Sequence, residues 1–244
     1  MQSIATGDAR PPTRHAQSAP AQPADAVMAG GTRLRRTATA KRQASYDDEV
    51  RTLIAATQTV IRRNGRSSTP RLADILTEAG MSNQAFYRHF RSRDDVIVAT
   101  YEQGLLRIHD YLARQVTREH SLRARLTAWI NGLLVQIDDP QLAALSSAII
   151  WNVGQIARGD SHVEPVGHHR ILLLLQTILA EGAVADPART ARLIQTLVFG
   201  TMTSYLESGE RPTAADRAHL LEFCLSGALA APLTPIDSPS TPKE

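Results

Sequence analysis

Apolar residues recur at spacings of three and four along most of this chain, which is the period of an amphipathic helix. The first apolar stripe runs from Val50 to Ile61. It predicts a helix from Tyr46 to Asn64, with Asp47–Glu49 in a first turn where the helix dipole favours acidic side chains. No stretch of the sequence alternates apolar and polar residues as a half-buried strand does. The pattern therefore predicts an all-α protein.

Residues that start or stop helices divide the rest of the chain. Thr69 is a predicted N-cap, with a proline at the first helical position. Gly80 suits the left-handed residue that ends this second helix. Ser82 is the predicted N-cap of a third helix that runs through Phe90, and Ser92 caps a fourth. Five more helices, which make about nine in all, are predicted at residues 121–138, 140–158, 166–182, 187–207 and 214–229.

The two ends of the chain lack the apolar pattern. Residues 1–45 contain almost no large apolar side chains, so we expect a disordered tail there. Its basic cluster, between Arg33 and Arg42, is placed either to enter a DNA minor groove or to act as an unspecific tether. Residues 230–244 contain four prolines and are expected to be disordered as well.

Charge is distributed unevenly along the chain. The formal net charge of +3 divides into +5 for residues 1–46, +1 for residues 47–95 and −3 for residues 96–244. A basic front and a mildly acidic remainder suit a protein whose N-terminal part meets a polyanion. A solvated tail with scattered surface charge is the alternative interpretation.

Cysteine usage and hydropathy exclude two classes of protein. Cys224 is the only cysteine, so no disulfide framework forms within one chain. The longest apolar run, Ile171–Leu175, is far shorter than the roughly 20 residues that cross a membrane. We therefore expect a cytoplasmic protein without a membrane partner.

The segment from Thr69 to Arg93 combines two short helices with a tight turn between them. This is the layout of a helix-turn-helix, whose second helix lies in the major groove of DNA. Asn83 and Gln84 project from the first turn of that second helix, and their amides can pair with adenine edges. An ordinary helical hairpin inside a bundle is the alternative.

This segment resembles the DNA-binding domain of the tetracycline-repressor (TetR) family of bacterial regulators. The resemblance covers about residues 47–108 and rests on Asp74-Ile75, Ala79-Gly80-Met81-Ser82, Phe86-Tyr87-Arg88-His89-Phe90 and Ser92-Arg93. Leu76 stands where the family usually has alanine, and Arg93 replaces its usual lysine. The resemblance implies a three-helix DNA-binding domain at residues 46–108, with the helix-turn-helix at about 71–90, followed by an effector-binding and dimerisation domain at 109–229.

The resemblance also implies roles for single residues. Asn83, Gln84 and Ala85 correspond to positions that read bases. Tyr87 and His89, which we expect on the exposed side of the helix, correspond to positions that contact phosphates. The full set of expected DNA-binding residues is Thr69, Arg71, Ser82, Asn83, Gln84, Ala85, Tyr87, His89 and Arg93.

The resemblance further implies partners for the rest of the chain. The last two helices, 187–207 and 214–229, would form a homodimer that binds a palindromic operator in double-stranded DNA. They carry more apolar surface than two helices hide alone, although a monomeric core is the alternative.

A small-molecule effector is expected in the helical region that follows the DNA-binding domain. Its candidate contacts, apolar with a few polar anchors, are Trp129, Leu133, Trp151, Gln155 and His168. The apolar majority favours a largely apolar effector. No metal or cofactor is expected, because adjacent histidines at 168 and 169 point about 100° apart on a helix.

Together these features predict a sequence-specific DNA-binding transcriptional regulator, a repressor that a small effector releases. A ligand-independent regulator or an activator stays open, as does a helical protein-binding adaptor. An enzyme is not expected, because the sequence offers no phosphate loop, nucleophile–base pair or metal-ligand spacing.

Overall fold

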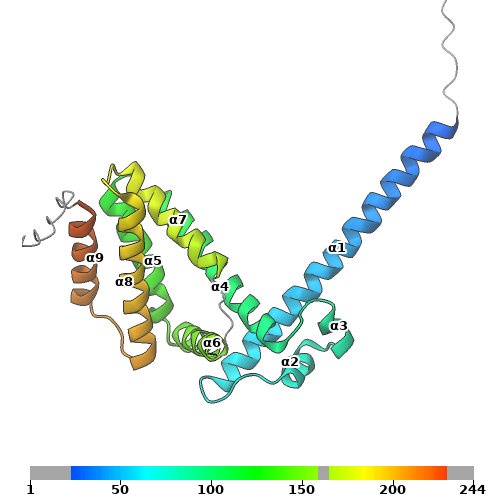
Figure 1. The fold of residues 1–244 in the computed structure, drawn as a ribbon, viewed down its shortest axis with the longest axis horizontal. Helices are drawn as coiled ribbons and strands as arrows, with labels where there is room; N and C mark the ends of the chain where they lie inside the picture. The colour runs from blue at the N-terminus through cyan, green and yellow to red at the C-terminus, as the bar shows by residue number, and fades with distance from the viewer. Residues whose placement is uncertain (1–22, 159–164, 230–244) are drawn as a thin grey trace, which may run out of the picture. The chain divides into compact units, whose positions relative to one another are not determined.

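The computed structural model describes residues 23–158 and 165–229, and side chains from residue 41 onward. Within these ranges all regular structure is helical, in agreement with the predicted class (Figure 1). The helices are α1 (Pro23–Asn64), α2 (Leu72–Ala79), α3 (Asn83–Tyr87), α4 (Arg93–Val116), α5 (Leu122–Asp138), α6 (Pro140–Ala157), α7 (Val166–Glu181), α8 (Pro187–Ser208) and α9 (Ala214–Leu229). None of them, over the residues described, is long and apolar enough to cross a membrane.

Helix α1 begins 23 residues earlier than the apolar stripe indicated. The expectation of a disordered tail is wrong for residues 23–45, which are helical, whereas residues 1–22 and 230–244 lie outside the described part. Alanine and arginine are frequent here and have high helix propensity. Side chains 41–48 are all exposed. For residues 41–45 the low hydrophobicity therefore correctly indicated exposed side chains, although it did not indicate a helix.

The chain divides within α1 into two compact units, residues 1–48 and residues 49–244. The first unit carries a local hydrogen bond from Gln43 Nε2 to Asp47 Oδ1 (2.8 Å). Asp47–Glu49 are in the interior of α1 and not in its first turn as expected. Their acidic side chains therefore do not act on the N-terminus of the helix.

Local capping residues set most of the other helix ends. Gly80 takes the left-handed conformation expected of it (φ 63°) and ends α2. Ser82 Oγ accepts the N–H of Ala85 at the start of α3. Ser92 forms a complete capping box with Asp95 at the start of α4.

The start of α2 differs from the prediction. Thr69 is not its N-cap; the helix begins after Arg71, whose carbonyl accepts the N–H groups of Asp74 and Ile75 (3.1 and 3.2 Å). Pro70 is buried and lies before the helix. Arg71 keeps an extended backbone, so the first helical residue comes two positions later than the sequence indicated.

Three clusters of apolar side chains form the cores of the second unit, and the smallest joins α1, α4 and α6 through Ile61, Ile97, Ala148 and Ile149. Of the other two, the smaller one joins α1–α4 and contains Leu53, Ile54, Ala56, Val60, Ile75, Leu76, Phe86 and Val96. The larger one fills the helical body, which we define as residues 93–229 (α4–α9). Helix α4 contributes to both, with Val96 in the first and Leu105 and Leu112 in the second.

Glycines allow two close approaches inside the helical body. A Cβ atom at Gly167 would lie 2.4 Å from Cβ of Leu105, so α7 packs directly on α4 only because this position lacks a side chain. A Cβ atom at Gly132 on α5 would meet Cδ2 of Leu112 at 2.5 Å. Both contacts hold neighbouring helices on α4 at short range.

Candidate functional site

Helix α3 presents polar side chains to solvent on one face and a buried ring on the other. Asn83 and Gln84 are exposed, as is the capping Ser82. Phe86 is completely buried in the small core. Because Phe86 fixes the inward face of so short a helix, the amides stand on the outward face, where they are free to reach a partner surface.

Tyr87 is the large exposed aromatic residue at the end of α3. Its side chain is 58% exposed. The ring packs edge-to-face against Phe86, with 5.3 Å between ring centroids. The buried ring therefore limits the orientation of the exposed one.

His89 does not lie on the exposed side of α3, so the expectation of an exposed position is wrong. Its side chain is 2% exposed, and its Nε2 is 2.7 Å from Oε2 of Glu49 on α1. Arg88 Nη2 donates to the same oxygen at 2.9 Å. The hydrogen bond with His89, followed by the charge of Arg88, lowers the pKa of the Glu49 carboxyl. His89 thus ties the end of α3 to α1.

The other residues expected to bind DNA are distributed around this helix. Ala85 is half-buried in α3. Thr69, half-buried, and Arg71, exposed, lie in the extended segment before α2. Arg93, at the start of α4, donates through Nε and Nη2 to Oδ1 of Asp94 (2.8 and 2.6 Å), so its charge is already paired.

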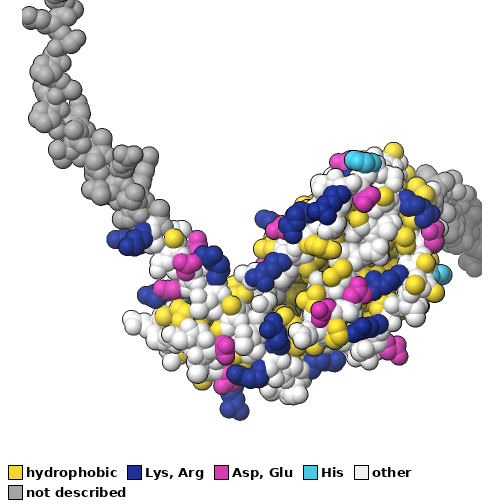
Figure 2. All heavy atoms as spheres, turned by 180° about the vertical axis from the view of Figure 1, so that it is seen from behind, with side chains coloured by type: hydrophobic (Ala, Val, Ile, Leu, Met, Phe, Trp, Pro, Cys, Tyr) yellow, Lys and Arg dark blue, Asp and Glu magenta, His cyan; other side chains and the backbone are white. Residues whose placement is uncertain are grey.

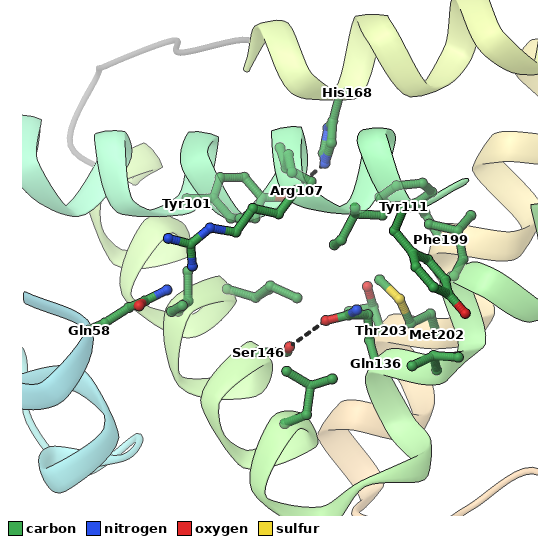
Figure 3. Close-up of a pocket in the computed structure, with 18 residues that line it drawn as sticks. Gln58, Tyr101, Arg107, Tyr111, Gln136, Ser146, His168, Phe199, Met202 and Thr203 are labelled. Carbon is green, nitrogen blue, oxygen red and sulfur yellow. Dashed lines mark hydrogen bonds between the residues drawn. The ribbon is translucent and has the colours of Figure 1, made fainter. Parts of the chain in front are cut away.

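A cavity of about 530 Å³ opens in the helical body, between α4–α8 and the end of α1 (Figure 3). Its volume is in the range of small-molecule sites. Most of its wall is apolar, and hydrophobic side chains gather in a hollow on one face of the body (Figure 2). The polar side chains in the wall are Gln58, Tyr101, Arg107, Tyr111, Gln136, Ser146, His168 and Thr203.

Hydrogen bonds and ring contacts hold several of these polar groups in place. Tyr101 Oη and His168 Nε2 are 2.8 Å apart, which links α4 to α7. The His168 ring also packs edge-to-face on Phe199, with 5.0 Å between centroids. Burial, with a smaller contribution from Glu102, raises the pKa of Tyr101 to about 12, so its phenol stays neutral. Ser146 Oγ donates to Gln136 Oε1 at 3.2 Å.

The structure separates the residues that the sequence suggested for an effector site. Leu133 and His168 line the cavity. Trp129 is completely buried in the core, and Trp151 and Gln155 are half-buried away from the cavity wall. The face of α6 that lines the cavity carries Leu142, Ser146, Ile149 and Ile150. Trp151 comes directly after Ile150, and its side chain points about 100° away from that of Ile150 around the helix axis.

Sequence reasoning missed the cavity face of α4, which carries Tyr101, Gly104, Arg107, Ile108 and Tyr111. Their spacings of three and four place them on one side of the helix. This mixed polar and apolar stripe is the sequence signal that could have indicated a cavity wall on α4. Over the described residues, no group of three or more His, Cys, Asp or Glu side chains is arranged to hold a metal ion.

The chain matches no protein-family model and no curated protein sequence. Similar solved structures include FadR of Bacillus subtilis in complex with stearoyl-CoA, with 18% identity and a TM-score of 0.51 over 72% of this chain and 97% of that one. NalD, the secondary repressor of the MexAB-OprM multidrug efflux pump in Pseudomonas aeruginosa, has 16% identity and a TM-score of 0.51 over 75% and 97%. A TetR-family transcriptional regulator from Agrobacterium tumefaciens has 18% identity and a TM-score of 0.50 over 76% and 100%.

This chain has the TetR fold. The likeness spans nearly the full length of these three proteins, and it confirms the resemblance that the motifs between Asp74 and Arg93 indicated, at the level of the fold. Helices α2 and α3 form the helix-turn-helix of this fold, and α4–α9 form its helical body.

The last two helices of the TetR fold leave large apolar side chains uncovered in this chain. Helices α8 and α9 lie side by side (Figure 1). Leu193 on α8 is 67% exposed, and Phe223 and Leu229 on α9 are 63% and 66% exposed. The neighbouring Cys224 points inward; it is buried, and burial raises the pKa of its thiol to about 11.

Proposed function

We propose that this protein is a sequence-specific DNA-binding transcriptional regulator, a repressor that a small, largely apolar effector releases from its operator. The observation that carries the proposal is the outward face of α3, where Asn83, Gln84 and Tyr87 stand exposed on a rigidly buried Phe86. Amides at the N-terminal turn of a recognition helix are suited to base edges in the major groove. The TetR fold supports this proposal.

Phosphate contacts would come from groups around the same helix. Tyr87 offers an exposed hydroxyl, and the capped N-terminus of α3 offers backbone N–H groups. Arg88, whose Nη2 holds Glu49, is also exposed and adds positive charge beside them. His89 would act indirectly, since its bond to Glu49 sets the position of the end of α3.

The place of α4 in the structure supports control by an effector. Its first turn packs in the small core through Val96, and its middle lines the cavity through Tyr101 and Arg107. A ligand that prefers one position of α4 would therefore shift the helix-turn-helix as well. The similar FadR structure holds stearoyl-CoA, which supports a ligand role for the body of this fold.

A two-fold dimer through α8 and α9 would complete the regulator. Leu193, Phe223 and Leu229 provide the exposed apolar surface that such an interface buries. Two recognition helices related by a two-fold axis would read a palindromic operator, with half-sites about 34 Å apart or slightly more.

The test starts from duplexes that the purified chain selects out of a random pool, because no operator is assumed. Fluorescence anisotropy then compares the selected duplex with a scrambled one at several salt concentrations. We expect at least a 100-fold preference for the selected duplex, in keeping with the specificity of such proteins. The variant Asn83→Ala/Gln84→Ala is expected to lose that preference while a salt-dependent, unspecific affinity remains.

The matched control is Asn131→Ala/Gln141→Ala, which removes two exposed amides from α5 and α6. It is expected to bind like the unchanged chain. If no duplex is selected, or if the control loses as much preference as the α3 variant, base reading by α3 is refuted. Folded protein with no affinity for any DNA would favour a helical adaptor instead.

A further inference from the structure

The cavity in the helical body has a marked imbalance of charge. Of the described residues in its wall, Arg107 alone carries a permanent charge, and none is an aspartate or a glutamate. The wall around it is mainly apolar, with aliphatic side chains such as Leu133, Ile149 and Ile150. An occupant of this cavity therefore meets one cation and a large apolar surface.

The guanidinium of Arg107 is available to an occupant. Its side chain lies across the cavity, with the guanidinium directed towards Gln58 (Figure 3). One donor, Nη2, bonds the neutral amide oxygen of Gln103 at 2.7 Å. Among the described residues no carboxylate pairs with Arg107. A planar guanidinium with free donors fits a carboxylate with two parallel hydrogen bonds.

The other titratable pair in the wall is already engaged with itself. Tyr101 and His168 are joined at 2.8 Å, and the neutral phenol adds no negative charge to the cavity. The His168 ring is further held between the rings of Tyr101 and Phe199. These groups shape the part of the wall that α4 and α7 form, and Arg107 is the group that selects charge.

We propose that the effector is an amphipathic acid whose single carboxylate pairs with Arg107 and whose apolar body fills the interior of the cavity. This rests on the proposed function in one respect, that the cavity is the effector site. An organic cation is excluded by charge, because the wall described here offers it no counter-ion and places it beside a fixed guanidinium. A neutral apolar compound would leave the guanidinium without its best partner.

The test uses three probes with the same ten-carbon chain: decanoate, decanol and decyltrimethylammonium, each below its critical micelle concentration. Isothermal titration calorimetry on the full chain measures their affinities without DNA. We expect decanoate to bind at least about 10-fold more tightly than decanol, the size expected of charge-assisted hydrogen bonds. The cation is expected to bind more weakly than decanol.

Variants of Arg107 then assign the preference to its side chain. Arg107→Gln should bind decanoate and decanol equally, and Arg107→Lys should keep part of the preference, because it retains the charge but not the planar fork. Arg114→Gln removes another exposed arginine of α4, outside the cavity wall, and should change nothing.

The proposal would be overturned if decanoate did not bind or bound no better than decanol. It would also be overturned if Arg107→Gln kept the preference for decanoate over decanol. Loss of preference in the Arg114→Gln control would count equally against it. Because the calorimetry contains no DNA, its failure differs from failure of the proposed regulator function, which appears as absence of a selected duplex.

Discussion

The helix-turn-helix and the cavity represent two ways of building a binding surface. The first is a convex surface on one short helix, α3. It is supported by a small core that contains a single fully buried phenyl ring, Phe86. The second is concave, and its wall takes residues from α1 and from α4–α8. In the first region a few local contacts decide the geometry, whereas in the second the packing of long helices does. Damage should therefore be local in one and distributed in the other.

The largest effect is expected from Phe86→Ala, which removes the ring that supports α3. Truncation of a buried phenylalanine costs about 3–5 kcal/mol of unfolding free energy. Hydrogen exchange should show loss of protection in α1–α3 while α5–α9 remain protected. Tyr87→Ala, at the exposed neighbour, should leave protection unchanged. If α5–α9 lost protection as well in Phe86→Ala, the two regions would not be energetically separate.

An intermediate effect is expected from Gly167→Ala in the helical body. The new Cβ would clash with Leu105, and overpacking of this kind costs about 1–3 kcal/mol. The midpoint of urea unfolding should therefore fall. The affinity for decanoate should fall as well, because Leu105 and His168 line the cavity. Gly154→Ala on α6 meets nothing within 4 Å and should be neutral or slightly stabilising. Equal losses in both variants would show that packing on Leu105 is not the cause.

The smallest effect is expected from Glu49→Gln, which weakens the link between α1 and α3. Hydrogen bonding to His89 lowers the pKa of Glu49 below its ordinary value of 4.5 in the folded protein. The stabilisation that the Glu49 carboxylate gives to the folded protein is therefore present above about pH 4.5 and is lost as the pH falls through the lowered pKa. The difference in thermal midpoint between Glu49→Gln and the unchanged chain should shrink in that window.

Glu119→Gln removes an exposed carboxylate elsewhere and serves as the control for the loss of one charge. Its thermal midpoint should follow that of the unchanged chain across the same pH range. A difference for Glu49→Gln that stays constant down to pH 3 would show that the carboxylate does not stabilise α3 through its charge.

Features that depend on neighbouring residues could be predicted from the sequence. The boundaries of α5–α9 follow from caps and apolar spacing, and Gly80 and Ser92 act as expected. The start of α2 could not be predicted in this way, because burial of Pro70 depends on contacts outside the segment.

Features that depend on contacts between residues far apart in the sequence could not be predicted. His89 matched a family position that contacts phosphates, but its partner Glu49 lies 40 residues away and draws the ring inward. The residues that line the cavity could not be predicted for the same reason. Trp151 looked suitable by chemistry, yet the rotation of α6 gives the cavity to its neighbour Ile150.

The buried Cys224 has a practical consequence for spectroscopy. It is the only thiol in the sequence, it is 2% exposed, and its raised pKa of about 11 keeps it protonated at neutral pH. Maleimide and methanethiosulfonate reagents should therefore leave it untouched in the folded protein. A single cysteine introduced at an exposed position such as Asn131 would accept a spin label or fluorophore without removal of the native thiol, so distances across the proposed dimer would become measurable in an otherwise unchanged background.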